Sequence, residues 1–264
     1  MTQSLSGRVA IVTGAGSLPG RGIGRGIVGS LCGYGAKVLA VDIDENTARE
    51  TAEKFSGEGH EVVPFRADVT NRDDLLAMVD TAVSRFGRLD ILVNHAGFGS
   101  FMALTETDDE HWDKMIALNL TSVFVASRAA VPHMMKNETG GVIINTISSA
   151  GIAGARAGLG YTAAKHGVVG LTRNIATTYA TRGIRCVGVC PGYTRSPLPE
   201  GMKPQIAHTD SADEAGILLG RMAGLSFRNG RPAELAEVIG FLATDTASFI
   251  NGAIIPVDGG WTAL

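Results

Sequence analysis

Short apolar runs alternate with longer amphipathic segments along the whole chain, and this alternation constrains the fold more than any other feature. The runs are continuously apolar, which is typical of strands buried on both faces of a parallel sheet. Strands are predicted over Val9–Thr13, Lys37–Val41, Val62–Arg66, Ile91–Val93, Val142–Asn145, Ile184–Val189 and Ala253–Val257. The pattern therefore predicts an α/β fold built on a doubly wound parallel sheet of about seven strands.

Amphipathic segments separate these strands and are expected to form helices on both faces of the sheet, as in a Rossmann fold. Helices are predicted over Gly24–Tyr34, Asn46–Phe55, Arg72–Phe86, Asp109–Met135, Gly160–Ala180 and Ala233–Ala243. No internal repeat or low-complexity linker divides the 264 residues, so we expect a single domain over 1–264. The Pro-rich stretch 197–231 interrupts the alternation and is expected to form a substrate loop, with a plain surface insertion as the alternative.

The composition narrows the possible partners. A formal net charge of −3 gives no support for binding nucleic acid or an anionic membrane. No window approaches 18 uninterrupted apolar residues and the first residues lack the features of a signal peptide, so we expect no membrane span and a cytoplasmic location. The three cysteines are expected to be buried free thiols, and the histidines lack metal-ligand spacing, so no metal site is predicted.

A glycine-rich turn joins the first strand to the first helix. Gly14 and Gly16 follow the strand, and Gly22, Ile23 and Gly24 open the helix. Glycines let the backbone approach a pyrophosphate closely, and a helix N-terminus supplies amides and partial positive charge. This position predicts a dinucleotide site that includes these five residues.

Asp42 ends the second strand, 18 residues after Gly24, near the spacing expected of an acid that binds a ribose 2′-hydroxyl. A carboxylate there would repel a 2′-phosphate, so we expect NAD as cofactor and consider NADP the weaker candidate. Arg21 and Arg25 complicate this expectation, because either is placed to reach a phosphate. The alternative role for Asp42 is that of a helix N-cap.

Further residues follow the strand ends at the same edge of the sheet. Contacts to the adenine and the central ribose region are expected from Asp68, Val69, Asn94, Ala96 and Gly97. Backbone and hydroxyl contacts to a flat ligand head are expected from Pro191, Gly192, Thr194 and Ser196, although a Pro-Gly turn is also ordinary loop chemistry. His95 lies among these residues, and a loop-packing role is favoured for it over acid–base chemistry.

Tyr161 and Lys165, with Ser148 placed 13 residues upstream, are the strongest candidates for chemistry. Residues four apart share one face of a helix, so an ammonium would lie beside a phenol. A cation favours the phenolate and lowers a pKa that is otherwise about 10, which yields an acid–base group usable near neutral pH. An isolated pair is equally compatible with an exposed helix surface. Catalysis is favoured here because Ser148 follows a buried strand at the ligand-binding edge.

Asn119 lies on the apolar stripe of its predicted helix. A buried amide needs hydrogen-bond partners. Asn119 is therefore either a structural amide that binds backbone or ordered water, or a water-holding link to Lys165, and the two roles are compatible.

In combination these motifs resemble those of the short-chain dehydrogenase/reductase family, over nearly the whole chain. The resemblance is carried, in order, by Thr13-Gly14, Gly22-Ile23-Gly24, Asp68-Val69, Asn94-His95-Ala96-Gly97, Asn119, Ser148, Tyr161 with Lys165, Pro191-Gly192 and the closing Pro256–Trp261. Several motifs in the right order and at the right spacing are far more specific than any one of them.

The resemblance implies roles for four catalytic residues. Tyr161 would exchange a proton with the substrate oxygen, and Ser148 would hydrogen-bond that oxygen. Lys165 would bind the nicotinamide ribose and lower the pKa of Tyr161, and Asn119 would hold a water connected to Lys165. The implied activity is that of an NAD(H)-dependent oxidoreductase interconverting a secondary alcohol and its ketone, in a homotetramer.

Departures from the family pattern keep alternatives open. Four extra residues, Ser17–Gly20, lengthen the glycine turn, while His95 and Cys190 stand where Asn is common. One alternative is a protein that senses NAD(H) without turnover. Another is an enoyl-thioester-type reductase, whose Tyr and Lys are spaced more widely. Apolar residues within 197–231 indicate an apolar substrate such as a cyclic alcohol, although a helix packing on the core would show the same pattern.

Overall fold

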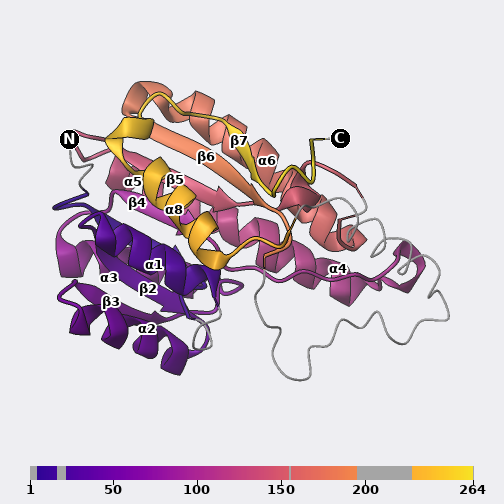
Figure 1. Ribbon diagram of the computed structural model, residues 1–264, viewed down its shortest axis with the longest axis horizontal. Coiled ribbons are helices and arrows are strands. Elements are labelled where there is room, and N and C mark those ends of the chain that lie inside the picture. The colour runs from indigo at the N-terminus through magenta and orange to yellow at the C-terminus, as the bar shows by residue number, and fades with distance from the viewer. Residues whose placement is uncertain (1–4, 17–21, 155, 195–227, 264) are drawn as a thin grey trace.

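A parallel sheet of seven strands forms the centre of the molecule (Figure 1), as the apolar runs predict. The computed structural model describes residues 5–16, 22–154, 156–194 and 228–263. The strands are β1 (Val9–Thr13), β2 (Lys37–Asp42), β3 (Val62–Arg66), β4 (Ile91–Asn94), β5 (Gly141–Thr146), β6 (Ile184–Pro191) and β7 (Ile254–Val257). Their order is β3-β2-β1-β4-β5-β6-β7, so the doubly wound topology predicted from the sequence is present.

Helices cover both faces of the sheet. They are α1 (Ile23–Gly33), α2 (Glu45–Gly57), α3 (Arg72–Phe86), α4 (Asp109–Ile116), α5 (Ser122–Met134), α6 (Leu159–Tyr179) and α8 (Pro232–Ala243). Three of them begin where a side chain caps the first free amides: Asp44 before α2, Asn71 before α3 and Asp108 before α4. Such caps satisfy backbone donors that the helix itself leaves unpaired.

Two apolar layers enclose the sheet. On one face, α1 and α8 pack together through residues such as Ile27 and Ile239. On the other face, α3 and α5 pack over the same strands through residues such as Met78 and Met134. Because both faces are covered, nearly every residue of β1, β2 and β4 is buried, which explains their continuous apolar sequences.

The helix predicted over Asp109–Met135 is not a regular α-helix throughout. A π-helical segment, Ala117–Thr121, separates α4 from α5 and contains Asn119. Insertions of this kind are frequent at functional sites, and sequence periodicity does not reveal them. The span Asp109–Met134 is long enough to cross a bilayer, and its most apolar 18-residue window has a mean hydropathy of 1.4, but half of that window is buried, as expected of a core helix.

The strand order reverses between β1 and β4, which are neighbours in the sheet although β2 and β3 lie between them in the sequence. In open α/β sheets this reversal leaves a crevice at the carboxyl ends of the strands, where ligands bind. Some residues with predicted roles lie outside the described part of the chain: the insertion Ser17–Gly20, Arg21, Ser196 and most of the predicted 197–231 loop.

Candidate active site

Ser148 follows β5 in an unusual backbone conformation. Its φ is 128° and its ψ is 155°, and it is the only non-glycine residue with positive φ in the described part of the chain. That region is almost exclusive to glycine, so the surrounding structure holds Ser148 in place against strain. The hydroxyl accepts a hydrogen bond of 3.1 Å from the Ala150 amide and lies close enough to the Tyr161 hydroxyl to lower its pKa. Ser148 and Tyr161 are thus brought together, as predicted.

Lys165 lies on the same side of α6 as Tyr161. Its Nζ is 5.5 Å from the centre of the Tyr161 ring and donates a 2.9 Å hydrogen bond to the carbonyl oxygen of Thr146, the last residue of β5. The Lys165 side chain is buried, with 3% of the residue exposed. The lysine is therefore anchored to the strand that leads into Ser148, and the three predicted catalytic groups form one cluster at the carboxyl edge.

Burial shifts the pKa values of both groups on α6. Desolvation lowers the pKa of Lys165 to about 8. Desolvation also raises the pKa of Tyr161, and the nearby Ser148 hydroxyl opposes this only in part. The expected lowering of the Tyr161 pKa is therefore wrong for this structure, in which that pKa is raised. The reason is that the expectation considered the neighbouring cation without the cost of removing the phenolate from water.

Asn119 uses its side chain to hold the loop that follows β4. Its amide nitrogen donates to the carbonyl oxygens of Phe98 (3.2 Å) and Met115 (3.1 Å), and its oxygen accepts from the Phe98 amide (3.2 Å). These bonds correspond to the first of the two roles expected for Asn119, that of a structural amide that binds the backbone. The other role, a link to Lys165, stays a prediction. A side chain at Gly97 would lie 2.7 Å from the Asn119 oxygen and 3.4 Å from Lys165 Nζ, so this glycine lets the two residues approach.

His95 and Cys190 also border the cluster. Neither of them is expected from the sequence to have a catalytic role. His95 Nδ1 lies 3.2 Å from the Thr146 hydroxyl, and its backbone amide is bound by Thr13, which fits a loop-packing role. Burial and the charge of Lys165 lower the pKa of His95 to about 4, so the ring is neutral at physiological pH. Cys190 is fully buried, and desolvation raises its pKa to about 11, which makes it a poor nucleophile.

The glycine turn after β1 fits a phosphate-bearing ligand. Gly14 has a φ of 69°, and a side chain at Gly24 would overlap the carbonyl oxygen of Gly14. At the start of α1, Gly22 provides no side-chain cap and the first turn, from Ile23, contains no acidic residue. Among the described residues no side chain caps the first amides of α1, an arrangement that suits an anion such as a dinucleotide pyrophosphate.

Asp42 lies beside this turn. Its carboxylate accepts hydrogen bonds from the amides of Gly16 (2.9 Å) and Asp44 (3.1 Å), and desolvation raises its pKa. The alternative role of helix N-cap is wrong for Asp42, because Asp44 caps α2. Arg25 does not compete for a phosphate here, since its guanidinium binds Glu50 (3.2 Å) and the Thr51 hydroxyl.

The remaining predicted cofactor residues differ in how they are placed. Asp68 accepts from the amide and hydroxyl of Thr70 at the start of α3, and the amide of Ala96 is bound by the Thr13 hydroxyl. Asn94 is buried, and its amide donates to Asn145 (2.8 Å) and Ser127. This side chain therefore joins β4 to β5 and α5 inside the core, and a side-chain contact to cofactor is not supported.

After β6, the backbone turns sharply beside the C-terminal segment. The Gly192 amide donates to the carbonyl of Val257, and a side chain at Gly192 would lie 2.8 Å from Asp258. The Thr194 hydroxyl donates to the Gly192 carbonyl at 3.3 Å. Pro191 ends the strand, and Val69, after β3, is buried at 9% exposure.

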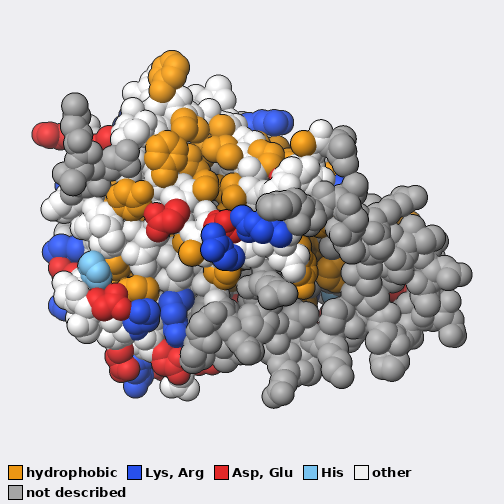
Figure 2. All heavy atoms as spheres, in the orientation of Figure 1, with side chains coloured by type: hydrophobic (Ala, Val, Ile, Leu, Met, Phe, Trp, Pro, Cys, Tyr) orange, Lys and Arg blue, Asp and Glu red, His pale blue; other side chains and the backbone are white. Residues whose placement is uncertain are grey.

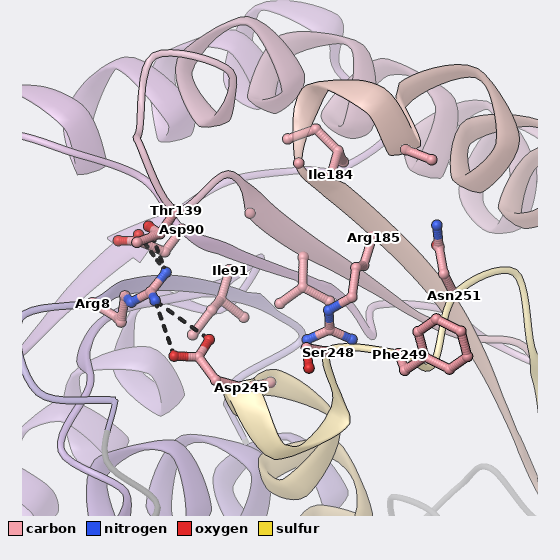
Figure 3. Close-up of a pocket in the computed structure, with 15 residues that line it drawn as sticks. Arg8, Asp90, Ile91, Thr139, Ile184, Arg185, Asp245, Ser248, Phe249 and Asn251 are labelled. Carbon is pink, nitrogen blue, oxygen red and sulfur yellow. Dashed lines mark hydrogen bonds and ion pairs between the residues drawn. The ribbon is translucent and has the colours of Figure 1, made fainter.

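A cavity of about 460 Å³ lies at the opposite, amino-terminal edge of the sheet (Figure 3). Arg8 bridges Asp90 and Asp245 there, both at 3.4 Å, and Arg185 donates to main-chain carbonyls such as that of Leu242. The Arg8 pairs are internal ion pairs, and none of the predicted catalytic residues lines the cavity. We therefore place the active site at the carboxyl edge.

Comparison with known proteins agrees with this architecture. A family model described as enoyl-(acyl carrier protein) reductase matches residues 16–262. The chain is 40% identical over 260 residues to 3beta-hydroxysteroid dehydrogenase 2 of Eggerthella lenta, covering 98% of this chain and 96% of that one. It is also 40% identical to cis-4-hydroxycyclohexanecarboxylate dehydrogenase of Sinomonas cyclohexanicum, over the full length of both chains.

A solved short-chain type dehydrogenase/reductase from Mycobacterium marinum superposes with a TM-score of 0.86 at 30% identity, covering 100% of this chain and 98% of that one. The named relatives are dehydrogenases of hydroxyl groups, which favours alcohol chemistry over enoyl reduction. The chain belongs to the short-chain dehydrogenase/reductase family, as an oxidoreductase of hydroxyl groups for which the family implies a nicotinamide cofactor.

Proposed function

We propose that the protein is an NAD(H)-dependent oxidoreductase that interconverts a secondary alcohol and its ketone, with Tyr161 as the acid–base group. The observation that supports this most is the cluster of Ser148, Tyr161 and Lys165 at the carboxyl edge of the sheet. The cluster lies at the same edge of the sheet as the turn after β1, where no described side chain caps the start of α1.

Tyr161 would give its proton to the substrate oxygen during ketone reduction and recover it during alcohol oxidation. Ser148 would hydrogen-bond the same oxygen and hold it at the phenol. Because burial disfavours the phenolate, the ammonium of Lys165 would be needed to stabilise that charge while the proton is away. A bound nicotinamide would supply or accept the hydride.

The choice of NAD over NADP rests on Asp42. Its carboxylate is positioned by two amides and would accept hydrogen bonds from a ribose diol, whereas a 2′-phosphate would meet a like charge. Arg25, the described arginine on α1 nearest the turn, is already paired with Glu50. The glycine turn and the first amides of α1 would hold the pyrophosphate.

The substrate is proposed to be apolar around its hydroxyl. Several large apolar residues flank the catalytic groups in the sequence and remain partly exposed: Phe98, Phe101, Ile152, Leu159 and Tyr193. The two relatives act, by their names, on a hydroxysteroid and on a hydroxycyclohexane acid, so we propose a cyclic secondary alcohol.

A purified sample incubated with cyclic alcohols and either NAD or NADP tests the proposal through the absorbance of reduced nicotinamide. Tyr161→Phe should lower turnover by about 10³-fold or more, since it removes general acid–base catalysis, while NADH still binds. Binding of NADH without turnover of any alcohol would favour the sensor alternative. Reduction of an enoyl thioester, with alcohols inert, would favour the enoyl reductase alternative.

We further propose that the chain is a cytoplasmic homotetramer. Phe249 is fully exposed, and β7 pairs with β6 alone among the described strands although its sequence is apolar. Apolar side chains gather over α8 and the β6–β7 side of the molecule (Figure 2). Such a surface is typical of one covered by another subunit. The three free, buried thiols suit a reducing compartment.

A further inference from the structure

Arg156 and Trp261 form an unusual pair beside the catalytic cluster. Arg156 lies in the connection from β5 to α6, and Trp261 lies in the C-terminal segment after β7. The guanidinium carbon of Arg156 is 4.4 Å from the centre of the indole ring, and Nη2 donates to the Trp261 carbonyl oxygen at 3.3 Å. Trp261 is buried, with 3% exposed. The stack fixes the plane of the guanidinium.

Both side chains carry a buried N–H group without an acceptor. Arg156 Nε and Trp261 Nε1 are buried and have no hydrogen-bond partner among the described residues, so a ligand would reach them only by displacing the atoms that cover them. Within the same residues, no carboxylate lies within ion-pair distance of Arg156, whereas Arg8, Arg88 and Arg228 each bind one. Leaving buried donors unpaired costs free energy, so an acceptor supplied by a ligand would be favoured.

The connection that carries Arg156 joins the two parts of the catalytic cluster, Ser148 after β5 and Tyr161 on α6. Arg156 is eight residues after Ser148 and five before Tyr161. The Gly158 amide donates to the Ser100 carbonyl at 2.6 Å, and in the same loop a side chain at Gly99 would lie 4.0 Å from the Tyr161 ring carbon that bears the hydroxyl. The loop after β4 therefore lies against both the Tyr161 ring and the connection that carries Arg156.

We infer that Arg156 and Trp261 form a subsite for a carboxylate on the substrate, remote from the hydroxyl that reacts. A planar guanidinium matches a carboxylate through two parallel hydrogen bonds, and the indole N–H adds a third donor. This rests on the proposed function and narrows its substrate class to hydroxy acids with an apolar, cyclic body. Ser148 and Tyr161 would receive the hydroxyl while Arg156 holds the opposite end.

Matched substrates test the subsite through catalysis. We expect kcat/KM for 4-hydroxycyclohexanecarboxylate to exceed that for 4-methylcyclohexanol, mainly through KM. Arg156→Gln should lower the value for the acid by about 10- to 100-fold, as expected for a lost hydrogen bond to a charged group. The same change should alter the value for 4-methylcyclohexanol by less than about 3-fold, which also shows that the variant is folded. Arg156→Lys should recover part of the loss, because the charge returns without the planar fork.

A binding measurement separates this inference from the proposed function. The chain has two tryptophans, so Trp112→Phe leaves Trp261 as the only indole reporter. Titration of that variant with cyclohexanecarboxylate should change the Trp261 fluorescence, and equimolar cyclohexanol should not. The same titration with cyclohexanesulfonate shows whether the subsite also binds a sulfonate. In the Trp112→Phe background, Arg156→Gln should abolish the response.

Distinct outcomes overturn the two proposals. Equal kcat/KM for the acid and the uncharged alcohol, or a fluorescence response unchanged by Arg156→Gln, would remove the subsite and leave alcohol oxidation standing. An Arg156-dependent response to cyclohexanecarboxylate without turnover of any alcohol would support the subsite and remove the proposed function. Trp261→Phe, which keeps an aromatic ring and loses the indole N–H, should raise the KM for the acid less than Arg156→Gln does. An equal or larger rise in KM for Trp261→Phe would contradict the larger role given to Arg156 in binding the carboxylate.

Discussion

The ammonium of Lys165 lies 5.5 Å from the centre of the Tyr161 ring, one helical turn away and on the same face of α6. It is held there by the carbonyl oxygen of Thr146, so its position depends on β5 as much as on the helix. Desolvation acts on both groups and in opposite directions: the pKa of the amine falls to about 8 and that of the phenol rises. The charge of Lys165 is therefore sensitive to mild alkali.

This shift predicts how stability depends on pH. Between about pH 8 and pH 10.5, the unfolded chain keeps a proton on Lys165 that the folded protein has lost, so the free energy of unfolding rises with pH in this window. The slope from one such group is at most about 1.4 kcal/mol per pH unit. Chemical denaturation from pH 7.5 to 9.5 measures it.

Lys165→Met is the matched control for this pH dependence, because it removes the titrating group and keeps a long side chain. We expect the wild-type stability to rise relative to that of the variant across the window. Parallel curves would show that the pKa of Lys165 is close to that of the unfolded chain.

The backbone of Ser148 predicts an opposition between stability and activity. At φ 128° and ψ 155°, glycine is unstrained and serine is not, so Ser148→Gly should raise the free energy of unfolding by about 1 kcal/mol relative to Ser148→Ala. Both variants should lose most turnover, since neither carries the hydroxyl. Thermal and denaturant unfolding of the pair measure the difference. Equal stability of the two variants would show that the conformation carries no strain.

Asp42 predicts the cofactor preference. Asp42→Ser removes the carboxylate that would repel a 2′-phosphate and bind the 2′-hydroxyl, so the ratio of kcat/KM for NAD to that for NADP should fall by about 10- to 100-fold. Asp44→Asn is a suitable control, because it alters the neighbouring acid that caps α2 and should leave the ratio unchanged. A wild-type enzyme that already prefers NADP would contradict the role given to Asp42.

Phe249 predicts the assembly. Sedimentation of the wild type should give a species about four times the 27.4 kDa mass of the chain. Phe249→Asp should shift it to smaller species, because a charge replaces an apolar contact. Leu104→Asp alters a residue that is 71% exposed beside the catalytic edge and should leave the assembly intact. A monomeric wild type would show that the exposed Phe249 surface is not a subunit interface.

Local patterns in the sequence were sufficient for the strands, most helices and the proximity of Ser148, Tyr161 and Lys165. Continuous apolar runs require burial on both faces, and a four-residue spacing on a helix requires a shared face, so both conclusions hold before any tertiary contact is known. The π-helical segment around Asn119 was not predictable in this way, because sequence periodicity does not reveal such insertions, and the contact of its side chain with Phe98, 21 residues earlier, is long-range.

The sequence by itself determined which residues meet at the carboxyl edge, since parallel strands bring their ends together whatever the side chains are. Only the tertiary structure decided the charge state and partners of those residues. Desolvation, and not the neighbouring cation, dominates the pKa of Tyr161, and the amide of Asn94 points into the core. Arg156 meets Trp261 across 105 residues. Burial and long-range contacts are properties of the packed chain, and no local pattern encodes them.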